Sequence, residues 1–246
     1  MSDVVLRYPD GEMPLAEVPA TVGESGLNIG PLLKTICRPW VVGAENLPAT
    51  GPVIIVGNHL SVIDSFFMPL MIDRRVHFLA KSDYFTGKGL KGWFVKTFML
   101  AVGQIPIDRS GGKASEASLN TGLAVLEHGD VLALYPEGTR SPDARLYRGR
   151  TGVARLVLES GAAVVPAVMI DTEKCMPIGA KIPRVRRIGT IIGKPLDFSR
   201  FAGMSADRFV LRSVTDEIMV EIQRLSQQEY VDVYASSVRS RVPAAR

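Results

Sequence analysis

The chain has 246 residues, of which 46% are hydrophobic and 22% charged. This length and composition fit one large globular domain, or one domain with a short appended element, and argue against long disordered stretches. The formal net charge of +4 suits an anionic partner, such as a lipid headgroup or a phosphorylated substrate, but selects none of them. The two cysteines, Cys37 and Cys175, stand far apart and form neither a disulfide framework nor a metal-ligand motif, so we expect no metal site.

The N-terminal region divides into two predicted segments. Residues 1–26 are rich in proline, glycine and acidic side chains, which predicts a loose arm and excludes a secretory signal peptide. Residues 27–44 are predicted to form an amphipathic segment close to a membrane. No apolar run approaches the roughly 18 residues needed to span a bilayer. We therefore expect a cytoplasmic protein, bound peripherally at the inner face of the cell membrane.

The predicted catalytic domain covers residues 45–230, with residues 231–246 as a tail. Its predicted strands are PVIIVG, VHFLA, GQIPI, VLALY, AAVVPAVMI and RRIGTIIG, separated by segments with helical spacing. Gly129 and Gly161 follow two of these segments and suit left-handed C-terminal caps, and a long final helix presents an apolar face from Leu211 to Leu225. This alternation predicts an α/β fold with a mostly parallel central sheet and helices on both faces.

A histidine and an aspartate follow the first predicted strand, in the segment GNHLSVIDSFF. Open α/β sheets place functional groups at such junctions, and a histidine oriented by a carboxylate is a typical general base. Because positions five apart differ by about 140° around a helix, we predict His59 in the turn before the helix, with Asp64 reaching back to it. Taken alone, His59 with Asn58 fits a helix cap without catalysis better. We predict that the other histidines, His77 and His128, are structural.

Three further segments carry unusual residues. GQIPIDRSGG, residues 103–112, ends a strand with Asp108 and Arg109. YPEGTRSPD, residues 135–143, places an acid, a glycine, a hydroxyl and Arg140 in one turn, and arginine offers a planar fork that matches phosphate oxygens. Taken alone, this turn fits a salt-bridged loop better than a phosphate site. In VVPAVM, Pro166 interrupts a strand, which predicts a sheet edge or a bulge that shapes a pocket wall.

In this order, NHLSVID, GQIPIDR, YPEGTRS and VVPAVM resemble the glycerolipid acyltransferase family, which includes the 1-acyl-glycerol-3-phosphate (lysophosphatidic acid) acyltransferases. The resemblance spans about residues 50–170, with Tyr135 standing where the family often has phenylalanine. It implies that His59 removes the proton from the acceptor hydroxyl as that hydroxyl attacks a thioester carbonyl. It implies that Asp64 fixes the imidazole tautomer and stabilises the imidazolium. The product would be phosphatidic acid.

The resemblance also implies an acceptor side that binds phosphate. Its expected members are Lys81, Arg109, Glu137, Gly138, Thr139 and Arg140. The transfer can be direct, so no serine nucleophile and no cofactor is expected beyond the co-substrate, which is acyl-CoA or acyl carrier protein. Backbone N–H groups near Gly138 or the His59 turn are candidates for stabilising the developing oxyanion.

Residues 88–103, KGLKGWFVKTFMLAVG, interleave lysines with bulky apolar side chains. This pattern suits an interfacial helix on anionic lipid, while the alternative is a core helix whose lysines face water. The residues concerned are Lys88, Lys91 and Lys96 with Trp93, Phe94, Phe98 and Met99.

Rival functions find less support in the sequence. GKGLKG fits G-x-G-x-x-G, but KSDYFT separates it from the preceding strand, which argues against a dinucleotide site. No G-x-S-x-G occurs, which argues against a serine esterase. Acyltransfer to glycerol-3-phosphate, another lysophospholipid or a glycolipid remains open. The non-enzyme alternative is a catalytically silent lipid-binding protein, and nucleic acid is not expected as a partner.

Overall fold

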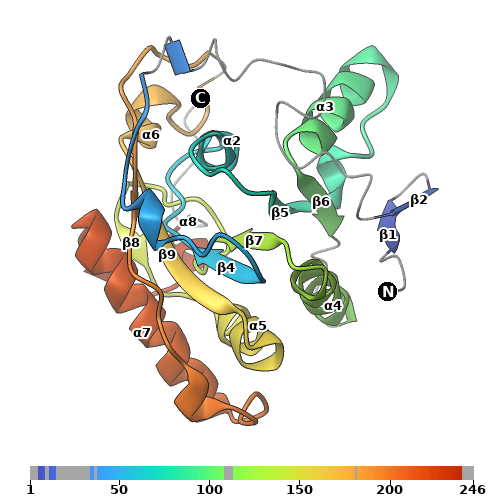
Figure 1. The fold of residues 1–246 in the computed structure, drawn as a ribbon. Helices are drawn as coiled ribbons and strands as arrows, with labels where there is room; N and C mark the ends of the chain where they lie inside the picture. The colour runs from blue at the N-terminus through green and yellow to red at the C-terminus, as the bar shows by residue number, and fades with distance from the viewer. Residues whose placement is uncertain are drawn as a thin grey trace.

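A computed structural model of the protein describes residues 5–8, 11–14, 34–35, 38–107, 113–180 and 182–239 (Figure 1). The strands are β1 (Val5–Tyr8), β2 (Gly11–Pro14), β3 (Trp40–Val42), β4 (Val53–Val56), β5 (Val76–Lys81), β6 (Gln104–Ile107), β7 (Val131–Leu134), β8 (Leu146–Tyr147), β9 (Ala163–Ile170), β10 (Gly189–Ile192) and β11 (Tyr230–Val231). The helices are α2 (Asp64–Leu70), α3 (Gly89–Ala101), α4 (Lys113–Glu127), α5 (Gly152–Ser160), α6 (Thr172–Cys175), α7 (Arg208–Ser226) and α8 (Ala235–Arg239), with short 3-10 turns at Ala44–Asn46, Ser82–Tyr84 and Ser199–Phe201.

The central sheet has seven strands in the order β3-β10-β9-β4-β7-β5-β6. All neighbouring pairs are parallel except β9 with β10, which is antiparallel. All six predicted strands are present. The prediction of a mostly parallel sheet is therefore confirmed.

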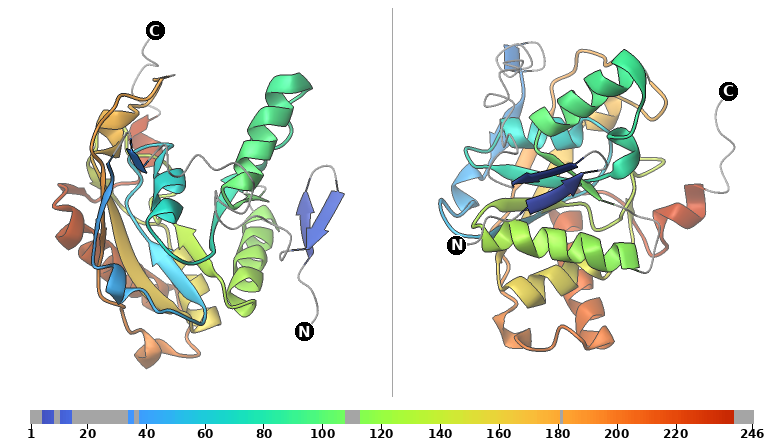
Figure 2. Two further views of the ribbon diagram at one scale, coloured as in Figure 1. Left: turned by 45° about the horizontal axis from the view of Figure 1, so that its top comes forward. Right: turned by 90° about the vertical axis from the view of Figure 1, so that its right-hand side faces the viewer.

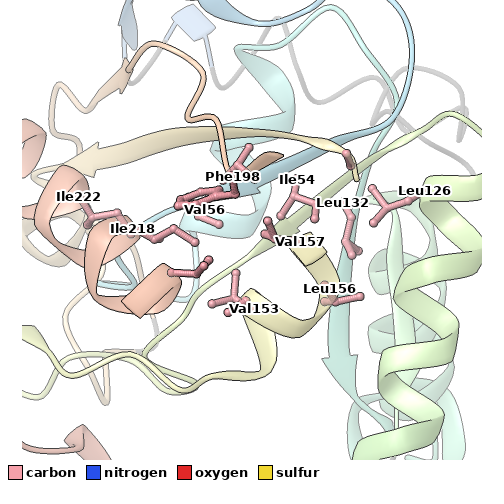
Figure 3. Packing of buried hydrophobic residues seen from close by; sticks show 14 of the residues in the cluster. Ile54, Val56, Leu126, Leu132, Val153, Leu156, Val157, Phe198, Ile218 and Ile222 are labelled. Carbon is pink, nitrogen blue, oxygen red and sulfur yellow. The ribbon is translucent and has the colours of Figure 1, made fainter. Parts of the chain in front are cut away.

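The apolar run of β4 explains why both faces of the sheet are covered. Its four residues are fully buried and alternate between two cores. Val53 and Ile55 pack with residues of α2, whereas Ile54 and Val56 pack with residues of α4, α5 and α7 (Figure 3). Figure 2 shows α2 and α7 on opposite sides of the strands. A strand buried on both faces is continuously apolar, as the sequence of β4 is.

The predicted helix ends are also present. Helix α4 is followed by Gly129 at φ +89°, and α5 ends at Gly161 with φ +62°, both in the left-handed region that glycine adopts without strain. Helix α7 begins after Asp207, whose carboxylate accepts the N–H groups of Phe209 and Val210. Within the described ranges, no helix combines the length and the apolar character needed to cross a bilayer.

The structure differs from the sequence prediction near both ends of the described chain. Strands β1 and β2 pair antiparallel where a loose arm was predicted. Within the predicted amphipathic segment, residues 40–42 form an edge strand parallel to β10, and most of residues 27–39 lies outside the described residues. In the predicted tail, β11 pairs with β8. These strands have two to four residues each, and their segments show neither a sustained apolar run nor an alternating pattern in the sequence.

Candidate active site

The predicted site residues lie together at the carboxyl ends of the central strands, because the strands that precede them are parallel. His59 follows β4, Lys81 ends β5, and Tyr135 begins the loop after β7. In the pairing of β5 with β6, Lys81 lies opposite Ile107. The side chain of Lys81 and the whole of Arg109 lie outside the described residues. Carboxyl ends of parallel strands are where α/β folds form their binding crevices.

The loop between β4 and α2 is anchored on its neighbours before it reaches His59. Gly57 donates its N–H to the carbonyl of Leu134 at 3.1 Å. A Cβ at Gly57 would lie 2.3 Å from the carbonyl oxygen of Ala167, so only glycine fits. The buried Asn58 side chain donates to the carbonyl of Met169 at 3.1 Å and accepts the N–H of Met169 at 2.8 Å. These bonds fix where the next residue stands.

His59 and Asp64 are in direct contact. The His59 Nδ1–H donates to Asp64 Oδ2 at 2.9 Å, and the same oxygen accepts the N–H groups of Leu60 and Ser61, both at 2.8 Å. Asp64 is fully buried as the first residue of α2, whereas the His59 side chain is 17% exposed. The predicted placement of the two residues is what the structure shows. Because Nδ1 is engaged, Nε2 is the nitrogen left to meet a substrate.

Tyr135 forms a flat support for the histidine. The two rings are stacked with centroids 4.0 Å apart and an interplanar angle of 5°. The Tyr135 hydroxyl has a partner in Ser65, with the two oxygens 3.1 Å apart. Burial raises the pKa of Tyr135 well above its ordinary value, so the phenol stays neutral. The tyrosine ring therefore fixes the plane of the imidazole, and its hydroxyl is hydrogen-bonded to Ser65.

The backbone of His59 is held by the YPEGTRS segment. Its N–H donates to Glu137 Oε2 at 3.1 Å, and its carbonyl accepts the N–H of Ser141 at 2.7 Å. Glu137 Oε1 accepts the N–H of Tyr147 at 2.9 Å, and the Glu137 side chain is buried away from the cavity. The expectation that Glu137 forms part of the acceptor side is therefore corrected: its carboxyl positions the backbone around His59.

The charge state of Glu137 suits a site for anions. Burial raises the pKa of this carboxyl to about 8, although the N–H groups of Tyr147 and His59 act in the opposite direction. At neutral pH the group is therefore largely protonated. A neutral Glu137 does not repel a phosphate bound nearby.

A cavity of about 390 Å³ opens beside His59. Gly138, Thr139 and Arg140 line it together with the histidine, and Arg140 has no carboxylate or hydrogen-bond partner within the part of the chain that the structure describes. The remaining walls come from α2, α3 and strands β5, β6 and β7, and include Val62, Phe66, Phe78, Leu79, Ala80, Met99, Ile107, Ala133 and Leu134. The cavity thus joins a base and a cation to a largely apolar interior.

Pro166 does not line this cavity, so the structure gives its predicted role as a wall of the acceptor pocket no support. It lies in β9, a central strand between β4 and β10, and not at a sheet edge. The predicted bulge is present: between the pair Ile192–Ala167 and the bridge Val164–Leu196, the register of β9 with the following chain shifts by one residue. Because the pairing on this side of β9 changes register at Pro166, the proline does not need the backbone N–H that it lacks.

The backbone candidates for an oxyanion site are already engaged. The N–H of His59 donates to Glu137, those of Leu60 and Ser61 donate to Asp64, and that of Gly138 donates to the Tyr135 carbonyl at 2.9 Å. None of these four groups is open to a substrate oxygen in this arrangement. Across the described ranges, no group of three potential metal ligands among His, Cys, Asp and Glu comes together.

Comparisons with known proteins find similarity to acyltransferases. A family model described as acyltransferase matches residues 38–170. The chain is 31% identical over 162 residues to the chloroplastic 1-acyl-sn-glycerol-3-phosphate acyltransferase of Arabidopsis thaliana, covering 65% of this chain and 44% of the relative. It is 28% identical over 140 residues to the 1-acyl-sn-glycerol-3-phosphate acyltransferase of Borreliella burgdorferi, covering 54% and 51%. The chain thus spans about half the length of these relatives.

The likeness extends to solved structures. The crystal structure of the 1-acyl-sn-glycerophosphate (LPA) acyltransferase PlsC from Thermotoga maritima matches with a TM-score of 0.58 and 20% identity, and 82% of each chain is covered. The likeness therefore extends well beyond the segment matched by the family model.

Proposed function

This chain belongs to the acyltransferase family, and on that premise we propose that it transfers a fatty acyl group from acyl-CoA or acyl carrier protein to the free hydroxyl of 1-acyl-glycerol-3-phosphate, giving phosphatidic acid. The observation that carries the proposal is the His59–Asp64 pair at a cavity that also holds Arg140 and has apolar walls. A lysophosphatidic acid needs all three: a base for its hydroxyl, a cation for its phosphate and an apolar surface for its chain. The names of the relatives point to the same acceptor.

In the proposed reaction, His59 Nε2 accepts the proton of the acceptor hydroxyl while the hydroxyl oxygen attacks the thioester carbonyl. The carbon–oxygen ester bond forms, the carbon–sulfur bond breaks, and the proton passes from the imidazolium to the leaving thiolate. Asp64 stabilises the imidazolium and keeps the proton of the neutral ring on Nδ1, because it accepts that N–H. No covalent acyl-enzyme is required.

The proposed reaction is tested by incubating purified protein with labelled palmitoyl-CoA and a panel of acceptors, followed by positional analysis of the product. We expect lysophosphatidic acid to be acylated faster than glycerol-3-phosphate, other lysophospholipids and a glycolipid. Preference for another acceptor would reassign the substrate. If no acceptor is acylated from either acyl-CoA or acyl carrier protein, the chain is a silent lipid-binding member of the family.

Arg140→Ala is expected to raise the KM for the acceptor about tenfold or more, because a hydrogen bond to a charged group contributes roughly 1.5–3 kcal/mol. Arg140 lines the cavity and has no internal partner among the described residues, so its guanidinium is available to a phosphate. Arg140→Lys should restore binding only in part, since an ammonium lacks the bidentate fork. The KM of each substrate is measured separately, and a rise confined to the donor would overturn the assignment.

We further propose that α3 is the surface through which the protein meets the membrane. Leu90, Trp93 and Phe94 are 87%, 64% and 62% exposed, which excludes Trp93 from the core. Their spacing of three and four residues places them on one side of the helix. Helix α3 stands on the side of the molecule away from α7 (Figure 2), and its Met99 lines the cavity. A helix that contacts lipid on one side and lines the cavity on the other suits an enzyme whose substrates have long acyl chains.

Changing Leu90, Trp93 and Phe94 together to serine should abolish co-sedimentation with anionic liposomes. Changing Lys88, Lys91 and Lys96 to glutamine should weaken it and reduce its salt dependence, because each lysine near an anionic surface contributes about 1 kcal/mol. Phe209→Ser, at a residue 69% exposed on α7, is the matched control and should bind like wild type. Binding that survives both triple changes would move the anchor to another segment, with residues 27–42 tested next.

A further inference from the structure

A second cavity, of about 210 Å³, adjoins the one that holds His59. The two share Leu79, Leu134, Tyr135 and Gly138 as lining residues. The second cavity continues between α4 and α5, where its walls are mainly apolar: Leu119, Pro136, Val153 and Leu156. The reaction proposed above uses the first cavity for the acceptor and leaves this one without a role.

An arginine without a neutralising carboxylate stands at the second cavity. The Arg150 backbone N–H donates to the Pro136 carbonyl at 2.8 Å, and its guanidinium donates to Ser236 Oγ at 3.0 Å while lying over the Tyr234 ring. No carboxylate pairs with Arg150 among the residues that the structure describes. Arg155, the other arginine at this cavity, is paired with Glu159 at 2.7 Å. Arg150 is therefore held in place by neutral groups, with its charge available to an anion.

Two further features beside Arg150 bear on an anionic ligand. Gly138, at φ +73°, leaves room for the arginine, since a Cβ there would lie 3.0 Å from Arg150 Nε. Gly152, which opens α5, lines the cavity, and Thr151 before it makes no side-chain cap. The uncapped N–H groups of that first turn add positive potential beside the guanidinium.

The proposed function requires a second anion site. An acyl thioester donor carries its acyl group on a phosphopantetheine arm, whether that arm belongs to coenzyme A or to acyl carrier protein. Arg140 in the first cavity is assigned to the acceptor phosphate and cannot hold both phosphates during one transfer. Each cavity has one arginine free of a carboxylate partner in the described chain, Arg140 in the first and Arg150 in the second.

We propose that the second cavity binds the phosphopantetheine arm of the acyl donor, with Arg150 on its phosphate and the thioester passing Gly138 toward His59. This inference rests on the proposed acyl transfer. The apolar walls contact the methyl and methylene groups of the arm, and the shared lining at Gly138 and Tyr135 provides the passage between donor and base.

The test compares three donors that carry the same acyl chain: palmitoyl-CoA, palmitoyl phosphopantetheine and palmitoyl pantetheine, which lacks the phosphate. Arg150→Gln should raise the KM about tenfold for the two donors with a phosphate and leave the pantetheine ester and the acceptor unaffected. Arg150→Lys should recover part of the loss. Arg224→Gln, at an exposed arginine of α7, is the matched control and should match wild type with every donor.

Palmitoyl-acyl carrier protein distinguishes the two natural sources of the arm. An equal KM rise with this donor supports the shared phosphate as the ligand. A rise with palmitoyl-CoA alone would place Arg150 on the nucleotide and overturn the proposal, as would an equal rise with the pantetheine ester. Calorimetric binding of coenzyme A separates this inference from the proposed function. If wild type acylates no acceptor yet binds coenzyme A through Arg150, only the proposed reaction fails.

Discussion

Replacing His59 by alanine is expected to lower the rate of acyl transfer by about 10²–10⁴-fold, the range that a positioned general base supplies. The imidazole stands at the cavity with Nδ1 held by Asp64, so Nε2 is the atom that can take the acceptor's proton. The fold should survive the change, because the loop is anchored through Asn58 and through the backbone of residue 59, which alanine keeps. Initial rates at saturating substrates measure the effect.

His128→Ala is the matched control for that experiment. His128 is partly exposed just after α4, contacts Asp130 and lines neither cavity, so the rate should stay at the wild-type level. Thermal unfolding of both variants confirms that the protein is folded. Retention of more than roughly a tenth of the wild-type rate in His59→Ala would rule out the general-base role, given the expected scale.

The fold was predictable because its strands and helices carry strong local patterns. Strands buried on both faces, such as β4, read as continuous apolar runs, and helices α4 and α5 are followed by glycines at positive φ. The contact between His59 and Asp64 was predictable as well, because the two residues lie only five positions apart at one strand–helix junction. In each case the signal and the structure lie in the same short segment.

The contacts that fail to show in the sequence join segments far apart in the chain. Glu137 looks like a substrate ligand within YPEGTRS, and only the fold reveals that its carboxyl turns inward to the N–H groups of His59 and Tyr147. Pro166 was placed at a pocket because an edge and a bulge are both compatible with a strand proline. Its central position follows from pairing with β4 and β10, which no local pattern encodes.

The second cavity could not be predicted from sequence for the same reason. Its lining comes from β5, from α4, from the end of β7 with the loop after it, and from α5 with Arg150 before it. These segments are separated in the sequence. Arg150 belongs to none of the motifs that carry the family resemblance, and its ring contact is to Tyr234, in a region predicted to be a tail. Arg150 is a candidate anion-binding residue only because of its neighbours in space, and no local sequence pattern indicates them.

Asp64→Asn is expected to lower the transfer rate by about 10²-fold, less than the loss of the histidine, because the base remains but is misoriented. One carboxylate oxygen accepts three N–H groups, from His59, Leu60 and Ser61. If the amide oxygen of asparagine keeps these contacts, the charge that stabilises the imidazolium is lost. If the amide nitrogen takes that place, its N–H groups point at three other hydrogen-bond donors and none of them finds an acceptor. The imidazole then turns away or changes tautomer.

A double mutant separates a role through His59 from a purely structural role of Asp64. If Asp64 acts through the imidazole, the variant with both His59→Ala and Asp64→Asn should be no slower than His59→Ala alone, because residues that act as one unit are not additive. If Asp64 only maintains the loop, its cost should multiply with that of the histidine, and the thermal midpoint should fall further in the double mutant. Rates that multiply in this way would remove Asp64 from the proposed mechanism and leave it as a residue that only holds the loop before α2, through the N–H groups of Leu60 and Ser61.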